Sequence, residues 1–287
     1  MLVIEILEYC NFKCYFCKAK DIVEPKYMSL DFFKKIILEA KELGITEIDL
    51  IPAKGEPFLH PNIYEMLEFL NEHMKHTLVF TNATAINVNR LKEVPMNRIK
   101  LCVSYYGATP EKFKELTAMD KNLFDIVHKR LKQMDESGIK YHLERRDYGY
   151  VFNYTGTDIN EKFDPKIKCH FHSMPKVMVN GDVEFCKFIK DNVPSGEKTA
   201  FANLNNVSLK EALTDPIRYK FFDSQSICIN HCSSFSKTCY KESISSFKLI
   251  AASKKNYLAN PEPVDQQYEE IEREIVQRAE QQTTDRS

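Results

Sequence analysis

The chain has 287 residues, of which 43% are hydrophobic and 28% are charged, and its formal net charge is −1. This length allows one large domain, or a domain with an appendage, and the near-zero charge gives no general attraction to nucleic acid or to a membrane surface. No apolar run approaches the ~20 residues of a membrane helix, and the apolar start at residues 1–7 is too short for a signal peptide. We therefore expect a cytoplasmic protein, in which nine cysteines favour metal or redox chemistry over disulfides.

The first half of the chain alternates predicted strands and helices. Apolar residues at helical spacing, such as Phe33, Ile36 and Ile37, predict a helix that Ser29 caps and Gly44 ends. The predicted strands are residues 2–7, 45–51, 77–81, 99–105 and 139–145, and further helices begin near residues 61, 87, 110 and 122. This alternation predicts right-handed βαβ units around a parallel sheet, with the chemistry on the loops at the carboxyl ends of the strands of a barrel or partial barrel.

Three cysteines follow the first predicted strand. Cys10, Cys14 and Cys17 form a Cys-x3-Cys-x2-Cys loop, CNFKCYFC. This spacing supplies three thiolates to a four-iron four-sulfur cluster and leaves one iron without a protein ligand. Cysteines at two- to four-residue spacing also bind zinc in a closed tetrahedral shell, so a zinc-stapled, non-enzymatic binding protein is a competing interpretation.

The cysteine loop resembles that of the radical S-adenosylmethionine superfamily. The resemblance implies an α/β fold, a partial (β/α)6 TIM-like barrel, with a 4Fe-4S cluster that holds S-adenosylmethionine on its open iron. It also implies reductive cleavage of S-adenosylmethionine to a 5'-deoxyadenosyl radical, with an electron from an external donor such as flavodoxin or ferredoxin. Cys10, Cys14 and Cys17 would then be the catalytic cluster ligands, and Phe16, just before the third cysteine, would pack on the adenine.

The loop after the second predicted strand resembles another family motif. Gly55-Glu56-Pro57 lies where the family has a Gly-Gly-Glu-Pro-like loop that binds the methionyl amino group, and Lys54 replaces the first glycine of that pair. Glycine lets the backbone approach closely, and the carboxylate of Glu56 is suited to pair with an ammonium group. The resemblance therefore implies that Gly55, Glu56 and Pro57 bind the cofactor.

Three more cofactor-binding residues are implied at the ends of later strands. Residues 81–83, Thr-Asn-Ala, resemble the family's Thr-Asn-Gly and imply a role for Asn82. The segment VSYYGATPEKF resembles the family's fourth-strand segment, in which Ser104 would contact the ribose; the alternative is a hydroxyl satisfied within the core. Arg145 would bind the methionyl carboxylate through a bidentate hydrogen bond, with Arg146 as the alternative.

A second cysteine-bearing region follows the point where the alternation stops. Asn180-Gly181 joins two apolar runs and predicts a type I' hairpin that brings Cys169 and Cys186 together. The segment resembles the auxiliary-cluster hairpin of the SPASM/twitch subfamily. The number of remaining cysteines suits one auxiliary 4Fe-4S cluster, as in a twitch module, and not two. The expected ligands are Cys169, Cys186, Cys228 and Cys232, with Cys239 either replacing Cys228 or remaining free.

The predicted organisation has three parts. Residues 1–147 form the radical S-adenosylmethionine core, and residues 148–259 form the twitch/SPASM-like module. Residues 260–287 form a charged tail that is either helical or disordered.

The resemblance also favours one type of reaction over others. In relatives, an auxiliary cluster accepts an electron from the substrate radical, which favours net oxidation, and the compact layout resembles twitch-type alcohol dehydrogenases of aminoglycoside biosynthesis. A small-molecule substrate, or a peptide delivered by a partner, is therefore expected, with Glu5, Asp49 and Tyr105 as candidate contacts. The alternative is maturation of a ribosomal peptide by cross-linking or epimerisation, for which Cys102 or Cys239 would be the hydrogen donor.

Overall fold

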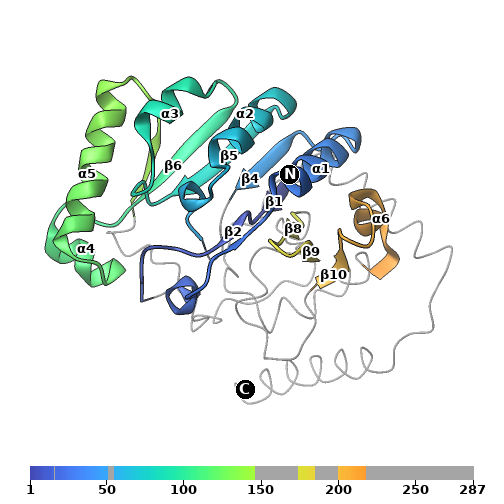
Figure 1. Ribbon diagram of the computed structural model, residues 1–287, viewed down its shortest axis with the longest axis horizontal. Helices are drawn as coiled ribbons and strands as arrows, with labels where there is room; N and C mark the ends of the chain where they lie inside the picture. Colours follow the sequence, from blue (N-terminus) through green and yellow to red (C-terminus); the bar gives the residue numbers. More distant parts are fainter. Residues whose placement is uncertain (16, 51–54, 146–173, 185–199, 218–287) are drawn as a thin grey trace, which may run out of the picture.

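The computed structural model describes residues 1–15, 17–50, 55–145, 174–184 and 200–217 (Figure 1). The strands are β1 (Leu2–Ile4), β2 (Leu7–Glu8), β3 (Lys26–Tyr27), β4 (Glu47–Leu50), β5 (His76–Thr81), β6 (Ile99–Tyr105), β7 (His142–Arg145), β8 (Lys176–Val177), β9 (Asp182–Glu184) and β10 (Ala200–Asn203). The α-helices are α1 (Leu30–Glu42), α2 (Ile63–His73), α3 (Val88–Glu93), α4 (Pro110–Thr117), α5 (Lys121–Glu136) and α6 (Leu209–Thr214), and short 3-10 helices cover Lys18–Asp21 and Pro57–Leu59.

Eight of the described strands form one sheet in the order β10-β9-β8-β1-β4-β5-β6-β7. Neighbouring strands from β8 to β7 run parallel, whereas β8, β9 and β10 pair antiparallel. The carboxyl ends of the parallel strands therefore meet at one edge, as the α/β alternation predicts. The predicted α/β partial-barrel fold is confirmed.

Local signals set the helix ends as expected. The Ser29 hydroxyl accepts a hydrogen bond from the backbone N–H of Phe32 and caps α1, and Gly44 follows the helix with a positive φ of 73°. Phe33 and Ile37 are fully buried beneath α1. The first strand is shorter than predicted, because the chain leaves the sheet after Ile4 and pairs with β3 through β2.

The two faces of the sheet differ in chemistry. Leu2 and Ile4 belong to the apolar core that the helices cover, whereas Val3 points to the other face. In register with Val3 lie Asp49 of β4 and Lys176 of β8, and Lys176 is in register with Glu184 of β9. All three charged side chains are buried, and Lys176 Nζ lies 2.9 Å from a carboxylate oxygen of Glu184. A row of buried charges thus crosses the face away from the helices.

The hairpin of β8 and β9 is confirmed, but the predicted turn type is wrong. The N–H of Gly181 donates to the carbonyl of Met178 at 2.9 Å, and Gly181 has a φ of +87°, whereas Asn180 is not in the left-handed region. A type I' turn needs both central residues in the left-handed region. The loop instead has three residues, 179–181, between Met178 and Asp182, and it ends on the left-handed Gly181. The Asn180 side chain stabilises this form by accepting the N–H of Asp182 at 3.2 Å.

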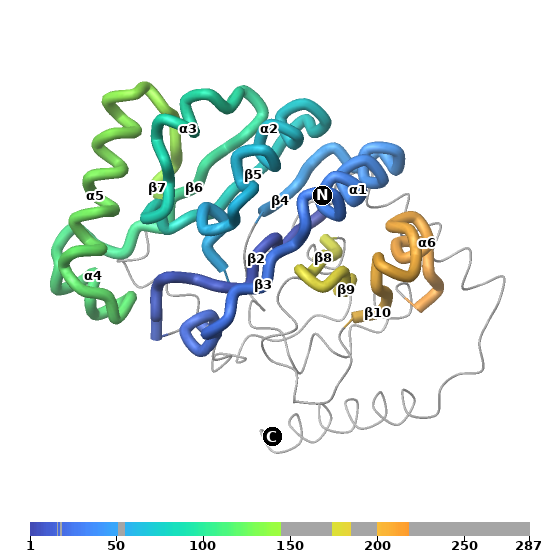
Figure 2. Tube along the Cα trace, in the orientation of Figure 1, coloured from blue at the N-terminus to red at the C-terminus, as the bar shows by residue number. Residues whose placement is uncertain are grey.

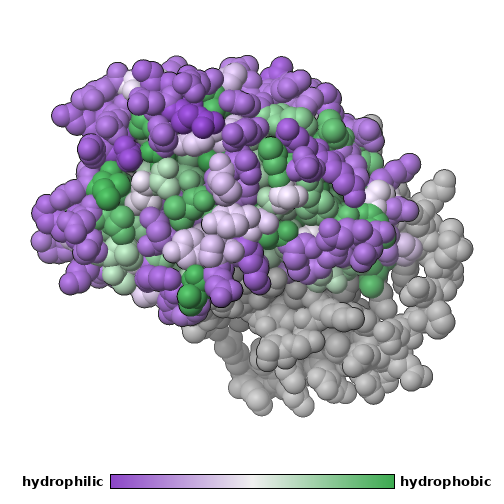
Figure 3. All heavy atoms as spheres, in the orientation of Figure 1, coloured by the Kyte–Doolittle hydropathy of each residue, from purple (hydrophilic) through white to green (hydrophobic). Residues whose placement is uncertain are grey.

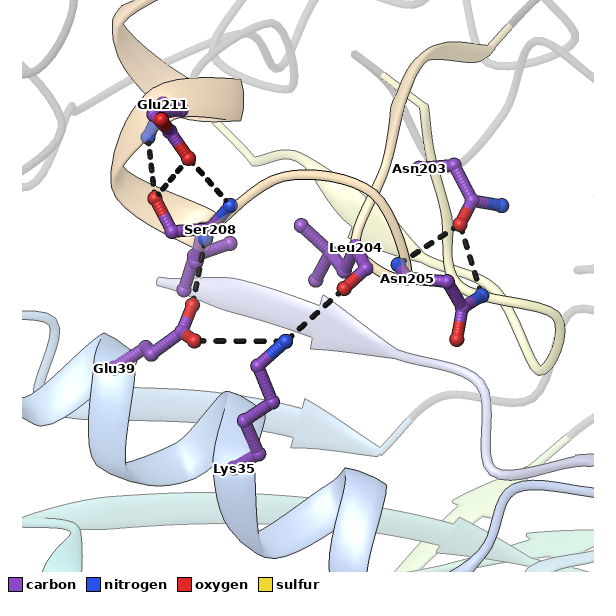
Figure 4. A network of polar contacts seen from close by, with 8 residues as sticks. Lys35, Glu39, Asn203, Leu204, Asn205, Ser208 and Glu211 are labelled. Atoms are coloured by element: carbon purple, nitrogen blue, oxygen red, sulfur yellow. Dashed lines mark hydrogen bonds and ion pairs between the residues drawn. The ribbon is translucent and has the colours of Figure 1, made fainter.

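A polar network joins this hairpin region to the core helix α1 (Figure 4). The trace in Figure 2 shows α6 beside α1. Glu39 of α1 accepts the backbone N–H of Leu209 at 2.6 Å, at the start of α6. Lys35, one turn earlier, donates to the carbonyl of Leu204 at 3.2 Å. Ser208 and Glu211 form a capping box that begins α6. The two contacts with Lys35 and Glu39 fix residues 204–209 beside α1.

The remaining organisation stays a prediction. The division at residue 147 is not decided, although β8, β9 and β10 extend the sheet of the core. The tail at 260–287 lies outside the described residues. The face seen in Figure 3 is mainly hydrophilic, with apolar side chains in smaller patches. No helix in the described part of the chain has the length and apolarity to cross a membrane.

Candidate functional site

The cysteine loop begins two residues after β2 and is held by its own backbone. The N–H of Phe12 points at Cys10 Sγ at 3.4 Å, and the N–H of Ala19 points at Cys17 Sγ at 3.4 Å. A turn closes between them through the N–H of Cys17 and the carbonyl of Cys14 at 3.0 Å. The Phe12 ring packs edge-on against Phe113, with the ring centroids 5.4 Å apart, and anchors the loop to α4.

The thiols of the cysteine loop influence one another electrostatically. Burial, together with the nearby charges of Glu56 and Cys17, raises the pKa of Cys10 to about 12. Burial also raises the pKa of Cys14, with added contributions from Cys17 and Cys10. The three thiols are thus close enough to influence one another, and iron must displace their protons on binding. Because N–H groups also point at Cys10 and Cys17, we conclude that this donor set fits an iron–sulfur cluster.

Gly55 brings the loop after β4 against the chain that enters the cysteine loop. A Cβ atom at this position would lie 2.1 Å from the carbonyl oxygen of Leu7 and 3.3 Å from that of Tyr9. The next N–H, that of Glu56, donates to the Tyr9 carbonyl at 2.9 Å. Glycine is therefore required at position 55 for the close approach of two backbone segments of the protein. The role in cofactor binding that the motif resemblance implies for Gly55 stays a prediction.

Glu56 joins two neighbouring loops. Its buried carboxylate accepts hydrogen bonds from Thr81 Oγ1 at 2.5 Å and from the N–H of Asn82 at 2.6 Å. It also accepts the N–H of Phe58 at 3.2 Å, and the buried Pro57 begins the short helix that follows. Burial raises the pKa of Glu56 to about 7, although these hydrogen bonds lower it. Its binding of the methionyl amino group stays a prediction.

Asn82 lies between Glu56 and the cysteine loop. Its side-chain nitrogen points at Asn11 Oδ1 at 3.0 Å and at Cys10 Sγ at 3.7 Å. The next residue, Ala83, is fully buried with a φ of +66°, in the region that favours glycine. The left-handed conformation gives a physical reason for the glycine in the family's Thr-Asn-Gly, and this chain reaches it with alanine.

The other predicted site residues are placed only in part. Ser104 is half-buried on β6. Arg145 ends β7, where its backbone is in register with Tyr105, and the side chain of Arg145 lies outside the described part of the structure. Tyr105 itself turns to the helices, where its hydroxyl lies 3.2 Å from Nε2 of His128, and its predicted substrate contact stays a prediction. The following lie outside the described residues: Phe16, Arg146, Cys169, Cys186, Cys228, Cys232 and Cys239.

The sequence motifs missed three residues of the site. Asn11 and Thr84 hydrogen-bond to each other and to Asn82, and the side chain of Tyr106 hydrogen-bonds to Cys14. Asn11 lies within the cysteine motif, and Thr84 follows Asn82 by two positions. Their adjacency to the motifs was the signal that could have identified them.

A parallel α/β sheet with three neighbouring cysteines in the loop that follows its first strand, tied to the next two strand-end loops, defines an iron–sulfur enzyme scaffold. A family model described as Radical SAM superfamily matches residues 4–151. The chain belongs to the radical S-adenosylmethionine superfamily. Membership implies a 4Fe-4S cluster and S-adenosylmethionine, and Cys10, Cys14 and Cys17 would hold the cluster. It also favours an iron–sulfur cluster over the zinc hypothesis.

Similar proteins cover different shares of the chain. A GTP 3',8-cyclase from Clostridium perfringens is 27% identical over 135 residues, which are 44% of this chain and 41% of that protein. The chain thus spans less than half of the length of this curated relative. Among solved structures, BtrN in complex with AdoMet and 2-DOIA has a TM-score of 0.58 at 18% identity, over 85% of this chain and 95% of BtrN. The protein anSMEcpe with bound AdoMet has a TM-score of 0.57 at 13% identity, over 90% and 97%. These structures share the fold.

Proposed function

We propose that this radical S-adenosylmethionine enzyme oxidises a polar small molecule, such as an alcohol, and passes one electron to an auxiliary 4Fe-4S cluster. The observation that carries the proposal is the position of the β8–β9 hairpin. β8 pairs with β1, the strand that leads to the cysteine loop. Cys186 follows the end of β9 with one residue between them, and Cys169 precedes β8. This arrangement supports one active site that uses both groups of cysteines.

The chain's own residues would position the reaction. Cys10, Cys14 and Cys17 hold the first cluster, and Glu56 and Asn82 order the adjoining loops. When bound, S-adenosylmethionine and the clusters supply a 5'-deoxyadenosyl radical and accept the surplus electron. An alcohol oxidised in this way would lose one hydrogen atom to the radical, then one proton to a base and one electron to the auxiliary cluster.

The face of the sheet away from the helices supports a polar substrate. Glu5 is fully buried just beyond β1, and Asp49 is buried on the neighbouring strand β4. Glu5 lies in the segment that leads from β1 toward the cysteine loop, and Asp49 is in register with Val3 of β1. We propose these carboxylates as hydrogen-bond acceptors for substrate hydroxyl or amino groups. BtrN, with its bound 2-DOIA, shares the fold alone, so the substrate itself must be identified experimentally.

Peptide epimerisation is the second candidate, and the position of Cys102 favours it. Cys102 is buried on β6 but is absent from the apolar core that contains Leu101 and Val103, so it points to the face away from the helices. A thiol on this face could return a hydrogen atom to a substrate radical. Cys102→Ala should then abolish turnover while leaving S-adenosylmethionine cleavage intact. Full turnover by this variant would exclude Cys102 as the donor, and Cys239→Ala would test the other candidate.

Counting iron tests the proposed auxiliary cluster. Anaerobically reconstituted protein should hold about eight irons by Mössbauer spectroscopy, and the Cys10/Cys14/Cys17→Ala variant about four. A Cys169/Cys186→Ala variant should also hold about four and still form 5'-deoxyadenosine from S-adenosylmethionine under dithionite. About four irons in the wild type, falling to none in the first variant, would remove the electron acceptor and with it the argument for oxidation.

A further inference from the structure

Asn11, Asn82 and Thr84 form a closed ring of side-chain hydrogen bonds beside the cysteine loop. Asn82 Nδ2 donates to Asn11 Oδ1 at 3.0 Å, and Asn11 Nδ2 donates to Thr84 Oγ1 at 2.8 Å. Thr84 Oγ1 then donates to Asn82 Oδ1 at 2.6 Å. Asn11 is 71 residues from Asn82 in sequence, so the ring joins the cysteine loop to the loop after β5.

The backbone N–H of Thr84 identifies which end of the Asn82 amide faces the cysteines. The backbone N–H of Thr84 lies 3.0 Å from Asn82 Oδ1, and a backbone N–H can only donate. The atom facing Thr84 is therefore the oxygen, and the nitrogen must face Asn11 and Cys10. One hydrogen of that nitrogen is used by Asn11, and the second is directed at Cys10 Sγ, 3.7 Å away.

Cys10 Sγ thus receives two N–H groups, one from the backbone of Phe12 and one from the side chain of Asn82. An N–H donor stabilises negative charge on a cluster sulfur. The reduced cluster carries one more negative charge than the oxidised cluster, so donors of this kind raise the reduction potential. The Asn82 backbone is itself held by Glu56 at 2.6 Å, which leaves the amide little freedom to turn away.

We propose that Asn82 is a positioning residue for the thiolate of Cys10 and raises the reduction potential of the cluster, with Asn11 and Thr84 fixing its orientation. This role differs from direct contact with S-adenosylmethionine, which the motif resemblance implies for Asn82. It rests on the family's cluster at Cys10, Cys14 and Cys17, and it does not depend on the substrate or on the auxiliary cluster.

The test is the midpoint potential of the cluster in holoprotein without S-adenosylmethionine, followed by electron paramagnetic resonance. The Cys169/Cys186→Ala background removes the predicted ligands of the auxiliary cluster, so that the signal reports the first cluster. Asn82→Leu removes the donor at similar volume, and we expect reduction to become about tenfold less favourable, a fall of about 59 mV for a one-electron couple. Thr84→Val keeps the Asn82 amide and the backbone N–H at position 84, but removes the hydroxyl that joins Asn82 Oδ1 to Asn11 Nδ2, and should lower the potential by a smaller amount.

The control is Asn87→Ala, which removes an asparagine side chain that caps α3 by accepting the N–H of Arg90. Its cluster potential should equal that of the parent protein. If Asn82→Leu takes up no iron, the Thr84→Val variant decides alone, since its amide donor is still present. Parent-like potentials in the measurable variants, or equal shifts in the control, would overturn the proposal. A fall in potential in Thr84→Val and Asn82→Leu, with an unchanged control, would support it.

Discussion

Gly55→Ala should damage the site because the glycine is in contact with backbone and not with a flexible side chain. The added Cβ would lie 2.1 Å from the Leu7 carbonyl oxygen and 3.1 Å from its carbon. Carbon–oxygen contacts between neighbouring backbones lie at about 3.3–3.6 Å, so one of the two loops must move by at least about 1 Å. That movement would weaken the hydrogen bond from Glu56 N–H to the Tyr9 carbonyl, now 2.9 Å.

The expected cost follows from these two effects. Overpacking costs about 1–3 kcal/mol, and loss of the hydrogen bond costs about 0.5–1.5 kcal/mol. We therefore expect urea unfolding of the iron-free protein to show a loss of about 2–4 kcal/mol. Because Leu7 and Tyr9 lead directly into Cys10, iron content after reconstitution should fall as well.

Gly44→Ala is the matched control. Gly44 has a φ of +73°, and no atom lies within 4 Å of the position that an added Cβ would take, so the change adds left-handed strain without a clash. The expected cost is about 1–2 kcal/mol, with full iron content. If Gly55→Ala destabilised the protein no more than Gly44→Ala and bound iron fully, the argument from close backbone approach would be refuted.

Three further predictions concern the loops and α6. Burial raises the pKa of Glu56 to about 7, so the protonated carboxyl group contributes stability below its ordinary pKa, and this contribution is lost as pH rises through about 7. From pH 5 to pH 8, the iron-free wild type should lose up to about 3 kcal/mol of unfolding free energy relative to Glu56→Gln in urea titrations. Parallel pH profiles of the two proteins would contradict this. Ala83→Gly relieves about 1 kcal/mol of left-handed strain but removes a buried methyl group of about 0.8 kcal/mol. Its stability should therefore stay within about 1 kcal/mol of the wild type, and a larger loss by thermal unfolding would show that the strain is not real. Glu39→Ala removes the acceptor for the N–H of Leu209 and should lower the free energy of unfolding by about 0.5–2 kcal/mol. Hydrogen exchange should become faster in α6 and stay unchanged in β5. Exchange in α6 as slow as in the wild type would argue against this anchor.

Local signals predicted much of the fold. Ser29 and Gly44 bound α1 because a cap and a left-handed stop act within a few residues, and apolar spacing gave the buried face. The turn after Met178 was harder, since Asn-Gly is compatible with two loop lengths and the side chain of Asn180 selects the longer one. The split of the first strand into β1 and β2 depends on pairing with β3, about twenty residues later, which no local pattern reports.

The site was predictable as a set of motifs but not as a set of contacts. The three cysteines and Gly55-Glu56 were identified from spacing and resemblance. The partner of Gly55 proved to be Leu7, and the described protein partners of the Glu56 carboxylate include Thr81 and Asn82. These contacts join residues 25 to 48 positions apart, and they form only once neighbouring strands are in register. Sequence spacing can therefore name the loops without showing that they hold one another.

This mutual support explains how the chain departs from the family motif at Ala83 and keeps the loop. The N–H of Ala83 donates to Thr81 Oγ1 at 2.9 Å, and the same hydroxyl donates to the carboxylate of Glu56. The next N–H, from Thr84, donates to Asn82 Oδ1. Each hydrogen bond contributes about 0.5–1.5 kcal/mol, which is enough to offset the strain of one left-handed alanine. The conformation near the cysteines is thus set by Glu56 and Asn82, and a glycine is not needed to reach it.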